Sequence, residues 1–278
     1  MDVNWTYDYA DYVRIIAESD CDVVHVNCDL YSFWPVLAAK DAGKKVVANI
    51  HDLSCARRED ALYDVYERAA LEAADAHIWV TPLQRDFAIS KGFDIADKPW
   101  THVLNFASRS VFIDKPLLPS IGGVVYAGGL SKRGDDTGRR DLSRIADALD
   151  GELHIYPGNT GVDYGIVYES EHDYPLYIEK IARHQWGFSG HPELNEAWAQ
   201  TFATKVGEYW AAGLPFISLN VPFMQEYADR GLGICIDSLD DLKRLPDPKP
   251  YRKCVLAQRD TLTTQSFAPQ LGDLFRSV

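Results

Sequence analysis

Lys205 and Glu208 open the stretch KVGEYWAAGLPFIS, which spans residues 205–218. The stretch predicts a helix that ends at Gly213, because glycine is common just past a helix end and Pro215 cannot continue one. Residues three positions apart share a helix face. A lysine and a carboxylate on one face either bind a polar ligand together or form an ordinary surface ion pair. Gly207, between them, is unusual inside a helix.

Further polar residues follow or end short apolar runs. In open parallel sheets ligands bind beyond the carboxyl ends of the strands, so these positions are candidates for a site. They are His25, Asn27, His51, Asp52, Thr81, Asn105 and the segments 128–133 and 200–208.

Alternating strands and helices must position these residues. Strands are expected at 21–27, 44–50, 76–81 and 100–105, and after a break at 123–130 and 152–158. Helical patterns lie between them, at 32–43, 63–75, 139–151 and 174–184, and two helices are expected within 249–276. This alternation is typical of parallel sheets. It predicts an α/β protein of two Rossmann-like lobes facing a central cleft, with segment 114–123 as the linker, residues 1–116 as the first lobe and residues 117–278 as the second.

Composition excludes several classes of protein. The net charge of −13 disfavours general binding to nucleic acid or to an anionic membrane. Five cysteines without a C-x-x-C pair suit reduced thiols. The acidic, aromatic start is unlike a signal peptide, and no apolar run approaches the roughly 20 residues that span a bilayer. We expect a cytoplasmic protein, with association at a membrane surface left open.

Four segments resemble the GT-B glycosyltransferases, specifically glycosyltransferase family 4. They are DCDVVHVN with LAAKDAGKKVVANIHDL, then ERAALEAADAHIWVTPLQRDFAISKGF with HVLNFASRSVF, then VVYAGGLSKR, and finally KVGEYWAAGLPFIS. Their order and spacing match the family over roughly residues 20–275. The pattern K-x-x-E-Y-x-A-x-G-x-P is the most specific of them.

The resemblance implies a nucleotide-sugar donor held by the second lobe. The helix that begins near Thr204 would point its amino end at the diphosphate, where free N–H groups and the helix dipole favour an anion. Lys205 would contact phosphate or ribose, and Glu208 would accept both ribose hydroxyls. Basic residues near Gly129 would neutralise the leaving phosphates. The candidates are Lys132 or Arg133 for one role and Arg139 or Arg140 for another.

On the acceptor side, the resemblance places His51 near the transferred sugar as a candidate catalytic residue. His25, Asn27 and Asn105 are weaker acceptor-side candidates, and each also suits a purely structural role. Gln200 departs from the family, because many relatives have a carboxylate eight residues before the helix glutamate. An amide still bonds a sugar hydroxyl, but it carries no charge.

The first lobe also departs from the family, since only about 20 residues precede DVVHVN. The lobe is naturally short, or the chain is a fragment, or another chain completes the site. An open sheet edge favours a homodimer or a covering helix, and residues 5–12 are candidates for either. Asp20-Cys21-Asp22 precedes its strand, so we interpret this D-x-D as chance and expect no metal and no cofactor besides the donor.

The resemblance therefore predicts a glycosyltransferase that moves a sugar from a nucleotide-diphosphate sugar with retention of configuration. The acceptor is open among carbohydrate, lipid, protein and, as a minority reading, nucleic acid. A sugar-nucleotide epimerase or hydrolase on the same fold is one alternative. A non-catalytic or partner-dependent protein that binds the donor is the other, and Gln200 and the short first lobe favour it.

Overall fold

The computed structural model describes residues 9–28, 33–57, 61–114, 117–134, 141–156, 162–191 and 200–278. The chain forms two compact units. One unit is Met1–Leu104 with Phe267–Val278, and the other is Asn105–Ser266. The chain thus leaves the first unit before the expected linker and returns to it with its last helix. Both sheets are parallel, which confirms the predicted α/β class.

The first unit contains a four-stranded sheet in the order β1-β2-β3-β4. Its strands are β1 (Val23–Cys28), β2 (Lys45–Ile50), β3 (Ala76–Trp79) and β4 (Trp100–His102). Its helices are α1 (Tyr9–Ala17), α2 (Trp34–Asp41), α3 (Ser54–Arg57), α4 (Ala61–Ala73), α5 (Pro82–Ser90) and α12 (Ala268–Ser277). The four strands are those predicted, each ending within three residues of its expected carboxyl end.

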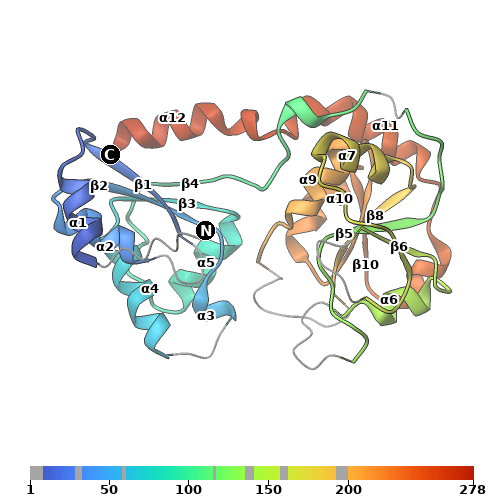
Figure 1. The fold of residues 1–278 in the computed structure, drawn as a ribbon, viewed down its shortest axis with the longest axis horizontal. Helices are drawn as coiled ribbons and strands as arrows, with labels where there is room; N and C mark the ends of the chain where they lie inside the picture. Colours follow the sequence, from blue (N-terminus) through green and yellow to red (C-terminus); the bar gives the residue numbers. More distant parts are fainter. Residues whose placement is uncertain are drawn as a thin grey trace, which may run out of the picture. The chain divides into compact units, whose positions relative to one another are not determined.

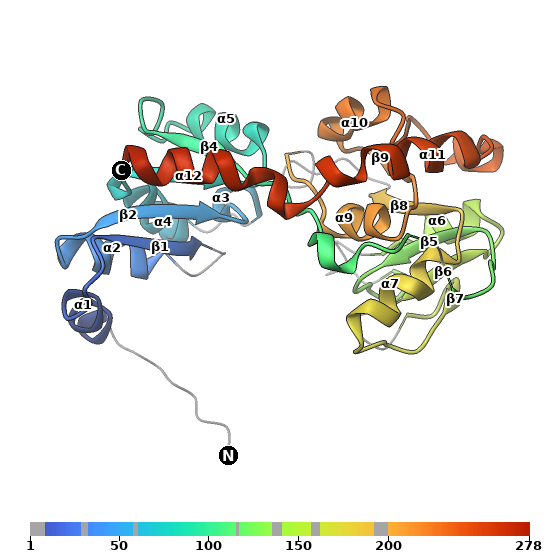
Figure 2. The same cartoon turned by 90° about the horizontal axis from the view of Figure 1, so that it is seen from above.

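The two faces of this sheet have different coverings because side chains alternate along a strand. Val26, Cys28 and Ala48 face the core formed with α2 and α4. Val47 faces the other way and packs with Leu274 of α12. Figure 1 shows α12 on one side of the sheet and α2 and α4 on the other, and Figure 2 shows α12 running beside β4.

The second unit contains a six-stranded sheet in the order β10-β9-β8-β5-β6-β7. Its strands are β5 (Val124–Ala127), β6 (Leu153–Tyr156), β7 (Ile166–Val167), β8 (Trp186–Gly190), β9 (Phe216–Leu219) and β10 (Gly233–Ile236). Its α-helices are α6 (Ser143–Ala148), α7 (Tyr174–Ala182), α9 (Thr204–Ala211), α10 (Gln225–Asp229) and α11 (Lys249–Gln258). Short 3-10 turns lie at Arg109–Val111, Pro222–Met224, Leu239–Arg244, Arg259–Thr261 and Thr264–Phe267.

Helix α9 lies unusually close to its neighbours because two contacts are made through glycine. A Cβ on Gly207 would lie 2.6 Å from the Asn105 carbonyl oxygen and 2.8 Å from the Ala107 nitrogen. A Cβ on Gly187 in β8 would lie 2.3 Å from the ring of Tyr209. Gly207 therefore allows backbone-to-backbone contact, which explains a glycine inside this helix. The Tyr209 hydroxyl then donates to the Phe188 carbonyl at 2.8 Å and anchors α9 to β8.

Candidate functional site

The N-cap residue of α9 makes no side-chain hydrogen bond to the start of the helix. The residue before the helix is Ala203, whose methyl group cannot accept from the first backbone N–H groups. Thr204, the first helical residue, is exposed. Uncapped N–H groups at a helix start attract anions. The first turn of α9 thus offers backbone N–H groups that the side chain of its N-cap residue does not accept.

Lys205 lies beside the turn that follows β5. Its Nζ is 4.9 Å from the centre of the Tyr126 ring, a distance typical of a cation–π contact. A Cβ on Gly128 would lie 3.7 Å from the Lys205 Cε, so the lysine side chain borders the glycine turn. The start of α9 and the carboxyl end of β5 therefore meet at this ammonium group.

Glu208 of α9 is half-buried and accepts hydrogen bonds from two tyrosines. The Tyr174 hydroxyl donates to its Oε1 and the Tyr177 hydroxyl donates to its Oε2, each at 3.3 Å. Burial raises the pKa of Glu208, while the two hydroxyls and Lys205 oppose that rise. The resemblance predicts a ribose as the partner of Glu208, and neither tyrosine was predicted to bond it. Their i,i+3 spacing on the 174–184 helix was the available signal.

The glycine turn after β5 carries the predicted phosphate contacts. Gly129 is half-buried, whereas Lys132 and Arg133 are exposed. Arg133 already forms a two-bond ion pair with Asp147, at 2.7 and 2.9 Å. No ion pair involving Lys132 occurs within the described part of the chain, so Lys132 is the better phosphate candidate. Arg139 and Arg140 lie outside the described residues.

Two other predicted residues border the start of α9. Gln200 is half-buried in the turn before the helix. Asn105, expected on the acceptor side, belongs to the second unit and donates from Nδ2 to the Phe202 carbonyl at 3.2 Å. Asn105 therefore ties the first residues of this unit to the loop that enters α9, which is a structural role.

In the first unit, three predicted residues lie on the sheet face that carries α12. The Asn49 Nδ2 donates to the Asn27 Oδ1 at 2.9 Å and lies 3.3 Å from the His51 Nε2. His25 precedes them on the same face and contacts the Phe275 ring edge to face, with ring centres 5.9 Å apart. This face is apolar at Val47 and becomes polar towards the carboxyl ends of β1 and β2.

The backbone of His51 is fixed from two sides. Its N–H donates to the Cys28 carbonyl at 3.0 Å, and its carbonyl accepts from the Gln84 Nε2 at 3.2 Å. The His51 side chain remains exposed. Burial lowers the pKa of His25, and the nearby His51 lowers it further. Asn49 and Gln84 were not predicted, although Asn49 pairs with Asn27 in the parallel register.

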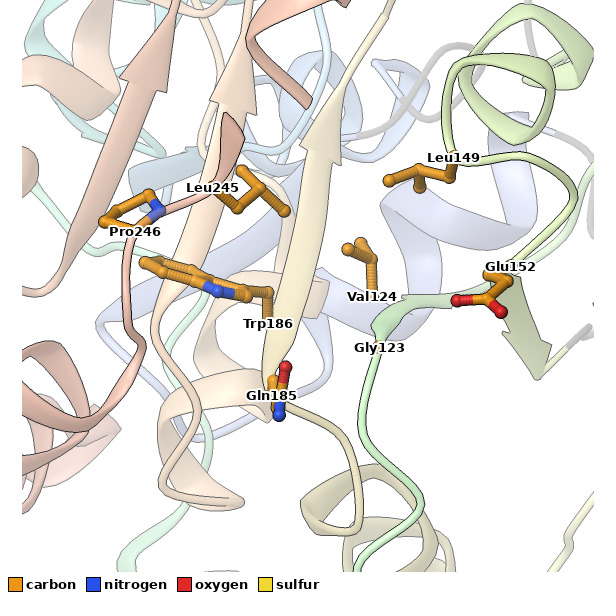
Figure 3. Close-up of a pocket in the computed structure, with 8 residues that line it drawn as sticks. All are labelled: Gly123, Val124, Leu149, Glu152, Gln185, Trp186, Leu245 and Pro246. Atoms are coloured by element: carbon orange, nitrogen blue, oxygen red, sulfur yellow. The ribbon is translucent and has the colours of Figure 1, made fainter. Parts of the chain in front are cut away.

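A hollow of about 190 Å³ lies at the opposite end of the second sheet. Figure 3 shows it between Val124 and Trp186, which are the first residues of β5 and β8. Glu152 and Gln185 are its main polar lining. The carboxyl ends of parallel strands are the usual place for ligands, so the hollow is not our candidate site.

Comparison with solved structures identifies the fold. Sucrose-phosphate synthase from Thermosynechococcus elongatus aligns at a TM-score of 0.70 with 15% identity, over 97% of this chain and 76% of that chain. The chain has the GT-B fold. Anabaena HepE in complex with UDP aligns at 0.74 with 11% identity, over 97% and 82% of the two chains. A trehalose 6-phosphate synthase from Burkholderia multivorans aligns at 0.61 with 11% identity, over 98% and 78%.

One segment of the sequence matches the model of a known domain family. Residues 4–98 match the family model of the glycosyl transferase 4-like domain, which covers much of the first unit. The predicted GT-B and family 4 resemblance is thereby confirmed. No match was found among curated proteins. Among the described residues, no helix is long and apolar enough to cross a membrane, and no group of three metal-binding side chains occurs.

Proposed function

We propose that this GT-B protein is a glycosyltransferase that takes a sugar from a nucleotide-diphosphate sugar. The second unit would bind the donor and the first unit the acceptor. The observation that carries the proposal is the half-buried Glu208 carboxylate, which lies one turn inside an uncapped helix start. Lys205 stands beside it at the glycine turn. A diphosphate next to a ribose diol needs this order of groups.

Each group has a role in binding and bond cleavage. The N–H groups of α9 and Lys205 would hold the diphosphate, and Lys132 would add charge from the glycine turn. As the bond between the sugar and the diphosphate breaks, negative charge grows on the departing diphosphate. Fixed donors therefore stabilise the transition state more than the ground state. His51 would contact the sugar from the first unit. The family resemblance carries the further expectation of transfer with retention and without a metal.

A thermal-shift panel with UDP, GDP, ADP, dTDP and CMP and their common sugars tests the donor site. Ligand at about 100 times its Kd stabilises a protein by ~2.7 kcal/mol, which is easily detected. We expect one nucleoside diphosphate to stabilise the wild type and to lose most of this effect with Glu208→Gln. Glu152→Gln, a matched change at the hollow, should leave the shift intact.

The opposite pattern would contradict the proposal. If Glu152→Gln abolishes the thermal shift and Glu208→Gln preserves it, the ligand binds in the hollow at the amino ends of the strands. Where binding is present, anomeric NMR of the product tests retention, and activity after EDTA treatment tests independence from metal.

A second candidate function is binding of the donor without transfer. Gln200 favours it, because many relatives have a carboxylate there and an amide cannot stabilise a developing positive charge as an ion. Release of nucleoside diphosphate in the presence of an acceptor panel distinguishes the two. Release with water alone indicates a hydrolase instead.

A further inference from the structure

The Glu208 carboxylate already accepts hydrogen bonds from two hydroxyl groups, one on each oxygen. The Tyr174 hydroxyl bonds Oε1 and the Tyr177 hydroxyl bonds Oε2. A ribose diol would present the same number of donors to the same two oxygens. Both distances are 3.3 Å, longer than the roughly 2.5–2.7 Å of a strong hydroxyl–carboxylate bond. The tyrosine bonds are therefore weak enough to exchange.

The two tyrosines differ in how firmly they are held. Tyr174 is the first residue of α7, and 41% of its surface is exposed. Tyr177 is half-buried, and its ring meets Tyr156 edge to face with centres 6.4 Å apart. Burial and the nearby Glu208 raise the pKa of both phenols, so both remain protonated donors at neutral pH. The Tyr174 ring also stacks on Tyr177, with ring centres 5.9 Å apart, but its greater exposure lets it turn into solvent. Tyr177 packs against Tyr156 as well and is the less free of the two.

We propose that the Tyr174 hydroxyl is a placeholder that a ribose hydroxyl of the donor displaces, while Tyr177 stays and orients the Glu208 carboxylate. This inference rests on the proposed function. In the free protein the placeholder gives the Glu208 Oε1 a hydrogen-bond donor, while Tyr177 bonds the other oxygen. In the complex the ribose takes its place, so part of the binding free energy is used to release Tyr174. Tyr174 is thus a determinant of selectivity for ribose.

The test uses calorimetric Kd values for UDP and GDP and for their 2′,3′-dideoxy counterparts. With Tyr174→Phe we expect the ribonucleotide to bind about three- to tenfold more tightly, because no hydroxyl competes for the carboxylate. The dideoxy nucleotide has no hydroxyl to gain from this change, so its Kd should hold. The preference for ribose over dideoxyribose therefore rises in this variant.

Three further variants test the roles of Tyr177 and Glu208 and provide a control outside the site. Tyr177→Phe should weaken the binding of the ribonucleotide, because Glu208 loses the donor that orients its carboxylate. Glu208→Gln should bring the ribose preference close to one. Tyr168→Phe removes a hydroxyl that bonds His154 instead, at 2.9 Å, and should change neither Kd.

An unchanged or lower ribose preference in Tyr174→Phe, in a protein that binds nucleotide through Glu208, overturns the placeholder and leaves the proposed function standing. Equal tightening of ribo and dideoxy nucleotides also overturns it, because the ring would then be blocking the site sterically. Absence of nucleotide binding in the wild type overturns the proposed function and this inference together.

Discussion

Two glutamates, one in each unit, show how similar buried carboxylates serve different ends. Glu67 in α4 is fully buried and accepts the backbone N–H groups of Ser54 and Cys55 at 2.7 and 3.1 Å. Glu208 in α9 is half-buried and accepts tyrosine hydroxyls at 3.3 Å. Burial raises the pKa of both. Backbone donors cannot leave without unfolding α3, whereas a phenol can rotate away, so only Glu208 is available to a ligand.

The largest expected effect is on folding at Glu67. Glu67→Ala removes the carboxylate that accepts two backbone N–H groups at the start of α3, at a cost of about 3 kcal/mol in the free energy of unfolding. Glu208→Ala leaves only side-chain hydroxyls, which can reach water, so it should cost about 1 kcal/mol or less. Urea unfolding of both variants measures the difference. Equal losses would show that both carboxylates are structural.

The next effect concerns the glycine beside Glu208. In Gly207→Ala the new methyl group meets only backbone, at 2.6 Å from the Asn105 oxygen, so α9 must shift. We expect a loss of about 2–3 kcal/mol in the free energy of unfolding. Gly272→Ala in α12 is the matched control, because its Cβ meets nothing closer than the Arg276 guanidinium at 3.4 Å. That change should stabilise by about 0.5–1 kcal/mol. A loss of stability in Gly207→Ala that is much smaller than this would contradict the close approach of α9.

The sequence predicted the strands better than the contacts. Periodic apolar runs fix buried strands, so β1 to β6 lie where we expected them. The helix expected over 139–151 is shorter, at Ser143–Ala148, because residues 141–142 and 149–151 are not helical. Residues 139–140 lie outside the described part of the chain. Helix α5 was not predicted, and α1 was expected only as one of two interpretations of residues 5–12, the covering helix. Tyr9 of α1 bonds Asp41 of α2, a contact between distant positions that no local pattern reveals.

The candidate site shows the same limit. The Lys205–Glu208 spacing predicted which groups share the start of α9, because helix geometry is local. The tyrosines that bond Glu208 come from α7, about 30 positions earlier, and only the packed chain brings them there. For a related reason the sequence did not reveal that Arg133 pairs with Asp147 of α6, which lies 14 positions later.

The raised pKa values of the two glutamates predict that the stability of the fold declines as the pH rises. Donor binding, which involves Glu208 alone, is expected to depend on pH in the opposite direction. A carboxyl whose pKa is raised above 4.5 on folding stabilises the folded protein below pH 4.5. This contribution is lost as the pH rises through the folded pKa. Glu67→Gln and Glu208→Gln should each reduce the decline in stability above pH 4.5. Denaturant unfolding from pH 4.5 to 8 checks this, and unchanged slopes would contradict the raised pKa values.

Donor binding should run the other way, because an ionised Glu208 is the better acceptor for ribose hydroxyls. The Kd of UDP-glucose, whose phosphates keep a fixed charge over this range, should weaken severalfold as the pH falls towards 4.5. In Glu208→Gln this dependence should vanish. A pH profile that persists in the variant would assign the titration to another group.

The smallest expected effect contrasts an ion-paired cation with one that has no ion pair among the described residues. Arg133 is held by Asp147 through two bonds, so Arg133→Ala should change the Kd of UDP-glucose less than about twofold. Lys132→Ala removes an exposed charge at the glycine turn and should weaken binding about two- to fivefold at low salt. Because exposed charges are screened, the Lys132 effect should fade near 1 M salt. A larger loss with Arg133→Ala would mean that a bound diphosphate takes Arg133 from Asp147, just as we infer that ribose takes Glu208 from Tyr174.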